Sequence, residues 1–217
     1  MSDTLLTINA ETTAANQSFL KRHEFLLFSI IGFVAKSALL VRLPYREWYI
    51  NSFWTGLIIA YFYCFFRFRY KATPPLITVF CLMMAVLMDV IGNVFHLYNT
   101  AILGIQYDDY THFLGSACSL VPAMWVFRTT SRRMGIRLPA DMMGFLSVCI
   151  TFSLCSWYEV LELWDEQFWG DMTRIWTTQD TAKDLQWDLA GIIFAALICT
   201  GVYKLLDRRE AAAPLNP

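Results

Sequence analysis

Residues 75–98 read PLITVFCLMMAVLMDVIGNVFHLY, a run of 24 residues with no lysine or arginine and one acidic residue, Asp89. A bilayer core about 30 Å thick is crossed by a helix of about 20 mostly apolar residues. The stretch is long enough and apolar enough for this role. It therefore predicts a membrane-spanning helix with a single carboxyl group in its second half.

Similar apolar runs recur along the whole chain of 217 residues. Hydrophobic residues make up 57% of it and charged residues 16%, whereas soluble domains have about 45–50% and about 25%. The predicted fold class is an all-α polytopic membrane helix bundle with about six transmembrane helices. The predicted spans are Glu24–Val41, Ile50–Phe66, Pro75–Tyr98, Tyr110–Phe127, Met142–Glu162 and Asp184–Leu206.

These spans make up one predicted transmembrane domain, residues 21–207. Residues 1–20 and 208–217 contain no apolar run and are predicted to be disordered cytoplasmic tails. The six cysteines all fall inside apolar runs, so we interpret them as packing residues rather than as members of disulfides. They are Cys64, Cys81, Cys118, Cys149, Cys155 and Cys199.

The distribution of lysine and arginine predicts the orientation, because these residues are enriched in cytoplasmic connections. Of the 17 such residues, twelve fall on the side of both tails, four on the opposite side and Lys36 within the first predicted span, which places both termini in the cytoplasm. The twelve are Lys21, Arg22, Arg67, Arg69, Lys71, Arg128, Arg132, Arg133, Arg137, Lys204, Arg208 and Arg209. With a net charge of −1, no basic surface suggests a nucleic acid partner.

Carboxylates and imidazoles gather at the predicted outer ends of the last four spans. Residues three or four apart lie on one face of a helix, so each group below shares a face. The groups are Asp89, Asn93 and His96; Asp108 and His112; Glu159 and Glu162; and Asp180, Asp184 and Asp188. We expect these four faces to meet at one end of the bundle.

Clustered carboxylates with an imidazole are typical ligands of a divalent metal, and oxygen-rich sets favour Mg²⁺, Mn²⁺ or Ca²⁺, while added histidine admits Zn²⁺ or Fe²⁺. Asp89 and His96 would either support the ligands or face the substrate, with Asn93 in the same polar group. Asp180 and Gln186 would orient the entry to the site. Lys36 is a candidate partner for Asp89. The predicted metal ligands are Asp108, His112, Glu159, Glu162, Asp184 and Asp188, of which the first four are also the predicted acid or base groups.

Some of these residues also have a purely structural interpretation. Asp108 and Asp184 lie near predicted helix starts, where a negative charge is favourable without any function. His96 could be an interfacial residue with a hydrated tip. Asp89, Glu159 and Asp188 lie within apolar runs, where an ionisable group is costly and usually functional. These three therefore indicate a buried polar network.

Three segments resemble, in order, motifs of the YjdF family of bacterial inner-membrane proteins. Residues 107–115, YDDYTHFLG, with VPA at 121–123, are similar to YDR-x-x-HF-x-x-G followed by VPA. Residues 158–162, YEVLE, resemble YELIEW. Residues 178–188, TQDTAKDLQWD, resemble TQGD-x-WDTQ-x-DM. The resemblance covers about residues 85–205, and a more distant likeness is to VanZ-like membrane proteins.

The sequence departs from these motifs at three positions, and its TQGD stretch is altered. Asp109 replaces an arginine, Leu163 a tryptophan, and Lys183 the tryptophan that precedes Asp184. The resemblance implies a small multi-pass fold in the bacterial inner membrane, and it implies no particular activity.

Three functions are compatible with the sequence. The first is an outward-facing carboxylate and histidine site that binds a divalent metal and acts on a lipid headgroup or a small envelope substrate. The second is a proton- or cation-coupled transporter of small solutes, with the same carboxylates as the coupling site. The third is a non-catalytic membrane scaffold or assembly factor whose polar residues hold helices together. Membrane lipids are the expected partners in each case.

Overall fold

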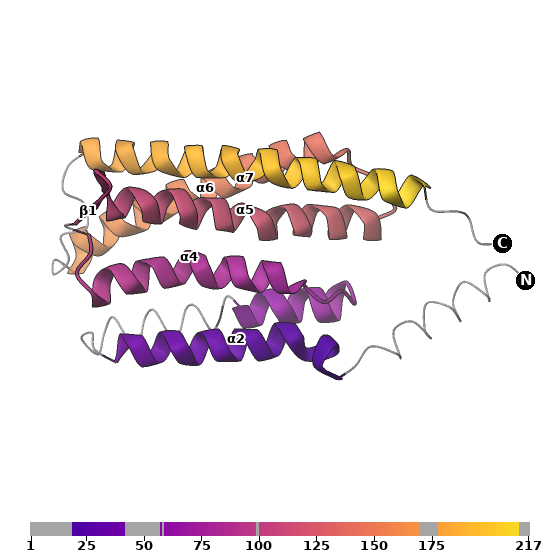
Figure 1. Ribbon diagram of the computed structural model, residues 1–217, viewed down its shortest axis with the longest axis horizontal. Coiled ribbons are helices and arrows are strands. Elements are labelled where there is room, and N and C mark those ends of the chain that lie inside the picture. Colours follow the sequence, from indigo (N-terminus) through magenta and orange to yellow (C-terminus); the bar gives the residue numbers. More distant parts are fainter. Residues whose placement is uncertain (1–18, 42–56, 58, 99, 170–177, 213–217) are drawn as a thin grey trace, which may run out of the picture.

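A computed structural model describes residues 19–41, 57, 59–98, 100–169 and 178–212, and long helices dominate these residues (Figure 1). One short hairpin interrupts them. The elements are α2 (Phe19–Leu40), the π-helix η1 (Phe65–Arg69), α4 (Leu76–Val94), β1 (Ala101–Ile102), β2 (Ile105–Gln106), α5 (Tyr107–Arg133), α6 (Ala140–Trp169) and α7 (Thr178–Ala212).

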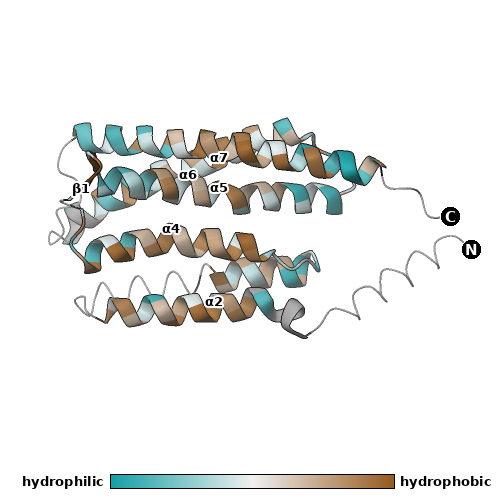
Figure 2. Ribbon diagram, in the orientation of Figure 1, coloured by the Kyte–Doolittle hydropathy of each residue, from teal (hydrophilic) through white to brown (hydrophobic). Residues whose placement is uncertain are grey.

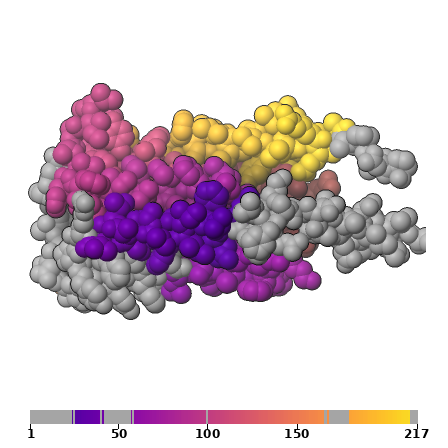
Figure 3. All heavy atoms as spheres, turned by 60° about the horizontal axis from the view of Figure 1, so that its bottom comes forward, coloured from indigo at the N-terminus to yellow at the C-terminus, as the bar shows by residue number. Residues whose placement is uncertain are grey.

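Helix α5 lies at the centre of the bundle, where it packs against α4, α6 and α7. Helix α7 also packs against α6, and α2 packs against α4. The space-filling view shows α2 along the outside of the molecule (Figure 3). Helix α2 begins and α7 ends at one end of the bundle, while the β1–β2 hairpin and the starts of α5 and α7 lie at the other (Figure 1).

The described helices have the polarity of a membrane bundle. Large apolar side chains such as Leu197 (72% exposed) and Phe145 (68% exposed) cover the outside, whereas Ser147 and Thr151 are buried. A soluble protein rarely exposes contiguous apolar surface of this kind. Hydrophilic residues concentrate toward the helix ends and apolar residues along the middle (Figure 2). The prediction of a membrane helix bundle therefore agrees with the arrangement of side chains.

Three of the six predicted spans are long and apolar enough to cross a membrane: α4, residues Ala140–Trp164 of α6 and residues Gln179–Ala212 of α7. Residues Leu26–Leu39 of α2 form a shorter apolar helix. Helix α5 is long enough but too polar to be counted with these three helices. Its polar side chains are accommodated because α5 lies at the centre of the bundle and packs against three neighbouring helices. Residues 50–56 and 58 of the second predicted span lie outside the described residues, and the count of six spans stays a prediction.

Helix α4 ends four residues before the predicted end of its span, because a Schellman turn closes it after Val94. The Leu97 amide donates to the Gly92 carbonyl (2.9 Å), and the His96 amide donates to the Asn93 carbonyl (3.4 Å). His96 has the left-handed backbone (φ 53°) that this turn requires. His96 is therefore past the helix rather than on the predicted helical face, and its side chain is exposed.

The β1–β2 hairpin connects α4 to α5. Its strands pair Ala101 with Gln106 and Ile102 with Ile105. The two turn residues, Leu103 and Gly104, both have positive φ (53° and 81°), as a type I′ turn requires. Because α5 starts directly after β2, the hairpin fixes the direction in which the first turn of α5 projects its side chains.

At the opposite end, ion pairs join α5 to α7. Arg128 lies 2.9 Å from Asp207 and 3.0 Å from Glu210, and Arg132 lies 2.7 Å from Glu210. The Arg128 guanidinium also lies over the Tyr203 ring, 4.6 Å from its centroid. Helix α7 continues beyond these contacts to Ala212, so residues 208–212 of the predicted tail are helical. Residues 1–18 and 213–217 of the predicted tails lie outside the described residues.

A glycine allows the closest approach of α7 to α5. A methyl group added at Gly191 would overlap the Phe113 carbonyl oxygen and lie 2.6 Å from the Ser116 hydroxyl oxygen. The neighbouring core includes Leu120 and Ile192, both fully buried. This contact lies one helical turn from Asp188, so it also sets how closely the polar faces of α5 and α7 meet.

We expect the substitution Gly191→Ala to lower the stability of the bundle, because the added methyl group must push the helices apart. Overpacking of this kind costs about 1–3 kcal/mol, which thermal unfolding of the detergent-purified protein would detect as a lower midpoint. Gly201→Ala is the matched control, since Gly201 lies on α7 with open space around it. Equal midpoints for the two variants would contradict the assigned α5–α7 contact.

Candidate functional site

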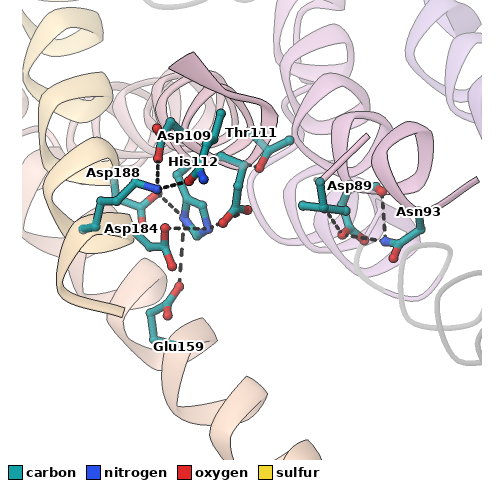
Figure 4. A network of polar contacts seen from close by, with 12 residues as sticks. Asp89, Asn93, Asp109, Thr111, His112, Glu159, Asp184 and Asp188 are labelled. Atoms are coloured by element: carbon teal, nitrogen blue, oxygen red, sulfur yellow. Dashed lines mark hydrogen bonds and ion pairs between the residues drawn. The ribbon is translucent and has the colours of Figure 1, made fainter. Parts of the chain in front are cut away.

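His112 is the centre of a cluster of four carboxylates at the hairpin end of the bundle (Figure 4). Its Nδ1 lies 3.3 Å from Asp188 Oδ1 and 3.9 Å from Glu159 Oε1. Its Nε2 lies 3.7 Å from Asp108 Oδ1 and 3.9 Å from Asp184 Oδ1. The structure thus brings together five of the six predicted metal ligands around one imidazole ring.

Helical periodicity places these side chains together. Asp108 and His112 are four residues apart on α5, and Asp184 and Asp188 are four residues apart on α7, so each pair shares a helix face. Glu159 reaches the cluster from α6. The Ser116 hydroxyl donates to the Asp188 carbonyl (3.0 Å), and this bond ties α7 to α5 beside the cluster. Three helices therefore build the site.

The cluster is buried and only partly hydrogen-bonded. Glu159, Asp184 and Asp188 are 4%, 5% and 4% exposed. Among the described residues, Glu159 Oε1 and Asp184 Oδ1 have no hydrogen-bond partner. Buried polar atoms in native proteins are almost always hydrogen-bonded, so each exception indicates a role or a bound ion. Both oxygens face the His112 ring.

A cavity of about 860 Å³ lies beside the cluster. Its wall includes Asp108, His112, Asp184 and Asp188, and also the predicted residues Glu162 and Asp180. A cavity of this size matches those that hold small organic ligands. The sixth predicted ligand, Glu162, thus faces the cavity rather than the imidazole.

The opposite wall of this cavity contains a second polar group, centred on Asp89 of α4. Its Oδ1 accepts hydrogen bonds from the Tyr98 hydroxyl (2.6 Å) and from the Asn93 side-chain amide (3.0 Å). Lys36 of α2, predicted as a partner, is buried and interacts electrostatically with Asp89. His96 also lines this wall. The predicted group of Asp89, Asn93 and His96 therefore shares one cavity with His112.

Gln186 is the predicted site residue that the structure places neither in the His112 cluster nor in the cavity wall. It lies two positions from both Asp184 and Asp188, and residues two apart point to different sides of a helix. Its side chain is exposed and is not part of the cavity wall. The prediction followed a motif position rather than the helical face.

Sequence reasoning missed two features of the site. Tyr98 follows the end of α4 and reaches Asp89 only because the chain turns back there. The second feature is an ion pair, in which Lys183 Nζ lies 2.8 Å from Asp109 Oδ1. Both residues were identified as departures from the family motifs, and their pairing couples the start of α7 to the start of α5. No periodic pattern within one helix could have predicted either contact.

The donor set suits a divalent cation. Asp108, His112 and Asp184 each offer one ligand atom, and these atoms lie within 4.8 Å of one another. His112, Glu159 and Asp188 form a second such group. Carboxylate oxygens with one imidazole nitrogen can bind Mn²⁺, Zn²⁺ or Fe²⁺, and a bound ion could polarise a substrate oxygen or activate a water.

A helix bundle with an apolar outside and a buried ionisable cluster defines a polytopic membrane protein. The chain belongs to the family described as "Predicted membrane protein (DUF2238)", whose model matches residues 25–209. No curated protein and no solved structure matches this chain. The likeness to the YjdF family stays a prediction, and the more distant VanZ-like likeness finds no support in these comparisons.

We expect removal of Lys183 to destabilise the protein, because it would leave the buried Asp109 carboxylate without its ion pair. The cost of such a loss is roughly 1–3 kcal/mol, and the Lys183→Met variant should show a lower thermal unfolding midpoint. The double variant with Asp109→Asn removes the stranded charge, so it should be more stable than Lys183→Met alone. If the two substitutions instead lower the midpoint by additive amounts, Lys183 and Asp109 do not stabilise each other and the prediction is wrong.

Proposed function

We propose that this protein is a multi-pass protein of the bacterial inner membrane whose buried histidine and carboxylate site binds a divalent metal ion. The site opens to the outer side of the membrane. There the bound ion acts on a lipid headgroup or a small envelope substrate held in the adjoining cavity. One observation carries this proposal: four carboxylates surround the imidazole ring of His112.

The distances in the cluster support an ion rather than direct hydrogen bonds. Three of the four separations between His112 and the carboxylates are 3.7–3.9 Å, whereas hydrogen bonds from nitrogen to oxygen are about 2.9 Å. Two ligands that each lie about 2.1 Å from a tetrahedral ion are about 3.4 Å apart. The spacing of the cluster is therefore close to that of ligands around a metal.

The outward orientation rests on the arginine and lysine distribution. Arg128 and Arg132 lie at the end of the bundle where α7 ends, and the His112 cluster lies at the opposite end. Basic residues are enriched on the cytoplasmic side of membrane proteins. With the arginine end in the cytoplasm, the cavity faces outward, where envelope substrates and outer-leaflet headgroups are available.

The cavity supports a small polar substrate. Its volume of about 860 Å³ exceeds what one ion and its waters need. Its walls carry hydrogen-bonding groups from Tyr98 and Tyr158 as well as the carboxylates of Asp89, Glu162 and Asp180. These groups could orient a polar headgroup while the metal ion polarises one of its oxygens.

The metal part of this proposal predicts that the detergent-purified protein retains a divalent metal, which elemental analysis would measure per chain. His112→Ala and Asp188→Asn should each reduce the retained metal by roughly tenfold or more, because each removes a ligand atom or its charge. Gln186→Ala is the control, since Gln186 is exposed on the same helix as Asp188. Trace metal that is equal in all four proteins would rule against a metal site.

The substrate part is tested in vesicles of phosphatidylethanolamine and phosphatidylglycerol. Mass spectrometry of the lipids should show a changed headgroup with the wild-type protein and none with His112→Ala. Uptake of a solute into these vesicles would favour the transporter instead. A scaffold would show neither activity, and its His112→Ala variant would lose only stability.

A further inference from the structure

We infer that the His112 site holds two divalent cations, one on each nitrogen of the imidazole ring. This inference rests on the proposed metal-binding function and adds the number of ions and their separate roles. The outer position consists of Asp108, His112 Nε2 and Asp184. The inner position consists of His112 Nδ1, Glu159 and Asp188.

The four carboxylates divide evenly between the two ring nitrogens. Asp108 and Asp184 lie nearest to Nε2, at 3.7 and 3.9 Å. Asp188 and Glu159 lie nearest to Nδ1, at 3.3 and 3.9 Å. The lone pairs of the two nitrogens point away from each other, so a single ion cannot reach both groups of oxygens. Each nitrogen instead completes a set of three ligand atoms.

Each set also contains one buried oxygen that has no hydrogen-bond partner among the described residues. In the outer position it is Asp184 Oδ1, and in the inner position it is Glu159 Oε1. Both residues are more than nine-tenths buried, at 5% and 4% exposed. A single ion would leave one of these two oxygens without a partner, whereas two ions would bind both.

The charge of the cluster points the same way. When all four are ionised, the carboxylates place four negative charges inside an apolar bundle, where uncompensated charge is costly. One imidazolium would offset one of these charges, and one divalent cation would offset two. Lys183, a described cation next to the cluster, is paired with Asp109. Two divalent cations would offset the four ionised carboxylates, and a bridging imidazolate would then leave one net negative charge.

The two positions differ in access, and this difference assigns their roles. The side chain of the outer ligand Asp108 is 25% exposed, whereas those of Asp184, Glu159 and Asp188 are 8%, 4% and 6% exposed. All three outer ligands line the cavity, whereas Glu159 of the inner position does not. Catalytic metal sites keep an open coordination position, and structural sites are closed. The outer ion therefore meets the substrate, and the inner ion joins α5, α6 and α7.

Bridging also balances the protons of the ring. A neutral imidazole binds the first ion through its unprotonated nitrogen. The second ion then takes the place of the remaining ring proton, which passes to water. His112 thereby becomes an imidazolate that links the two ions.

Equilibrium binding of Mn²⁺ to the full-length, detergent-purified, chelator-treated protein tests this inference. Wild type should bind two Mn²⁺ per chain. Asp184→Asn and Glu159→Gln keep the side-chain shape and should each bind one. The ion that remains in Glu159→Gln occupies the outer position, so an added chelator should remove it at least about tenfold faster than the ion that remains in Asp184→Asn.

Asp141→Asn and Gln186→Ala serve as controls on α6 and α7. Asp141 is exposed and paired with Lys204 at the far end of α6, and Gln186 is exposed. Both controls should bind two Mn²⁺. Circular dichroism and size-exclusion chromatography of every variant would establish that lost binding is not caused by misfolding.

The possible results separate this inference from the proposed function. One Mn²⁺ per wild-type chain, lost in both Asp184→Asn and Glu159→Gln, would overturn the two-ion arrangement and leave a single metal site. Two ions that neither variant affects would place the metal elsewhere and overturn the inference. The absence of bound Mn²⁺ together with the absence of retained metal would overturn both proposals.

Discussion

The cost of keeping carboxylates inside an apolar helix bundle constrains the rest of this structure. A charged carboxyl group within a membrane-spanning helix costs about 2.5–3.5 kcal/mol on insertion scales, and Glu159, Asp184 and Asp188 are all nearly excluded from solvent. Their attraction to His112 offsets part of this cost. Because the four residues come from α5, α6 and α7, the same attraction determines how these helices meet, and the close contact at Gly191 allows them to meet there.

The two walls of the cavity meet this constraint in different ways. On α4, Asp89 accepts hydrogen bonds from Tyr98 and Asn93, so its charge is stabilised by neutral donors supplied by the protein. Around His112, two carboxylate oxygens lack any such donor among the described residues. The Asp89 carboxylate thus already has hydrogen-bond donors from the protein, whereas the oxygens around His112 would be stabilised by an added cation. This asymmetry is why the His112 wall is the reactive one in our proposal.

How much of this arrangement the sequence could predict depends on how far apart in the chain the two residues of each contact lie. The faces that carry Asp108 with His112 and Asp184 with Asp188 depend only on helical spacing, so they could be predicted. Gln186 was placed with them from a motif, although a residue two positions from Asp184 points to a different side of the helix. The Lys183–Asp109 pair joins two helix starts that are far apart in the sequence, and no local pattern encodes such a contact.

The two ends of the α5–α7 pair provide an internal comparison for the electrostatics of the site. Where α7 ends, each carboxylate has a guanidinium partner, with separations of 2.7–3.1 Å between Arg132 and the acids Asp207 and Glu210. Where α7 begins, four carboxylates share the ring of His112 at 3.3–3.9 Å. The same two helices can therefore pair their charges fully when arginine is present. Among the described residues, the four carboxylates whose ion pair is with His112 lie at the end that opens into the cavity, where a cation from outside the protein can bind.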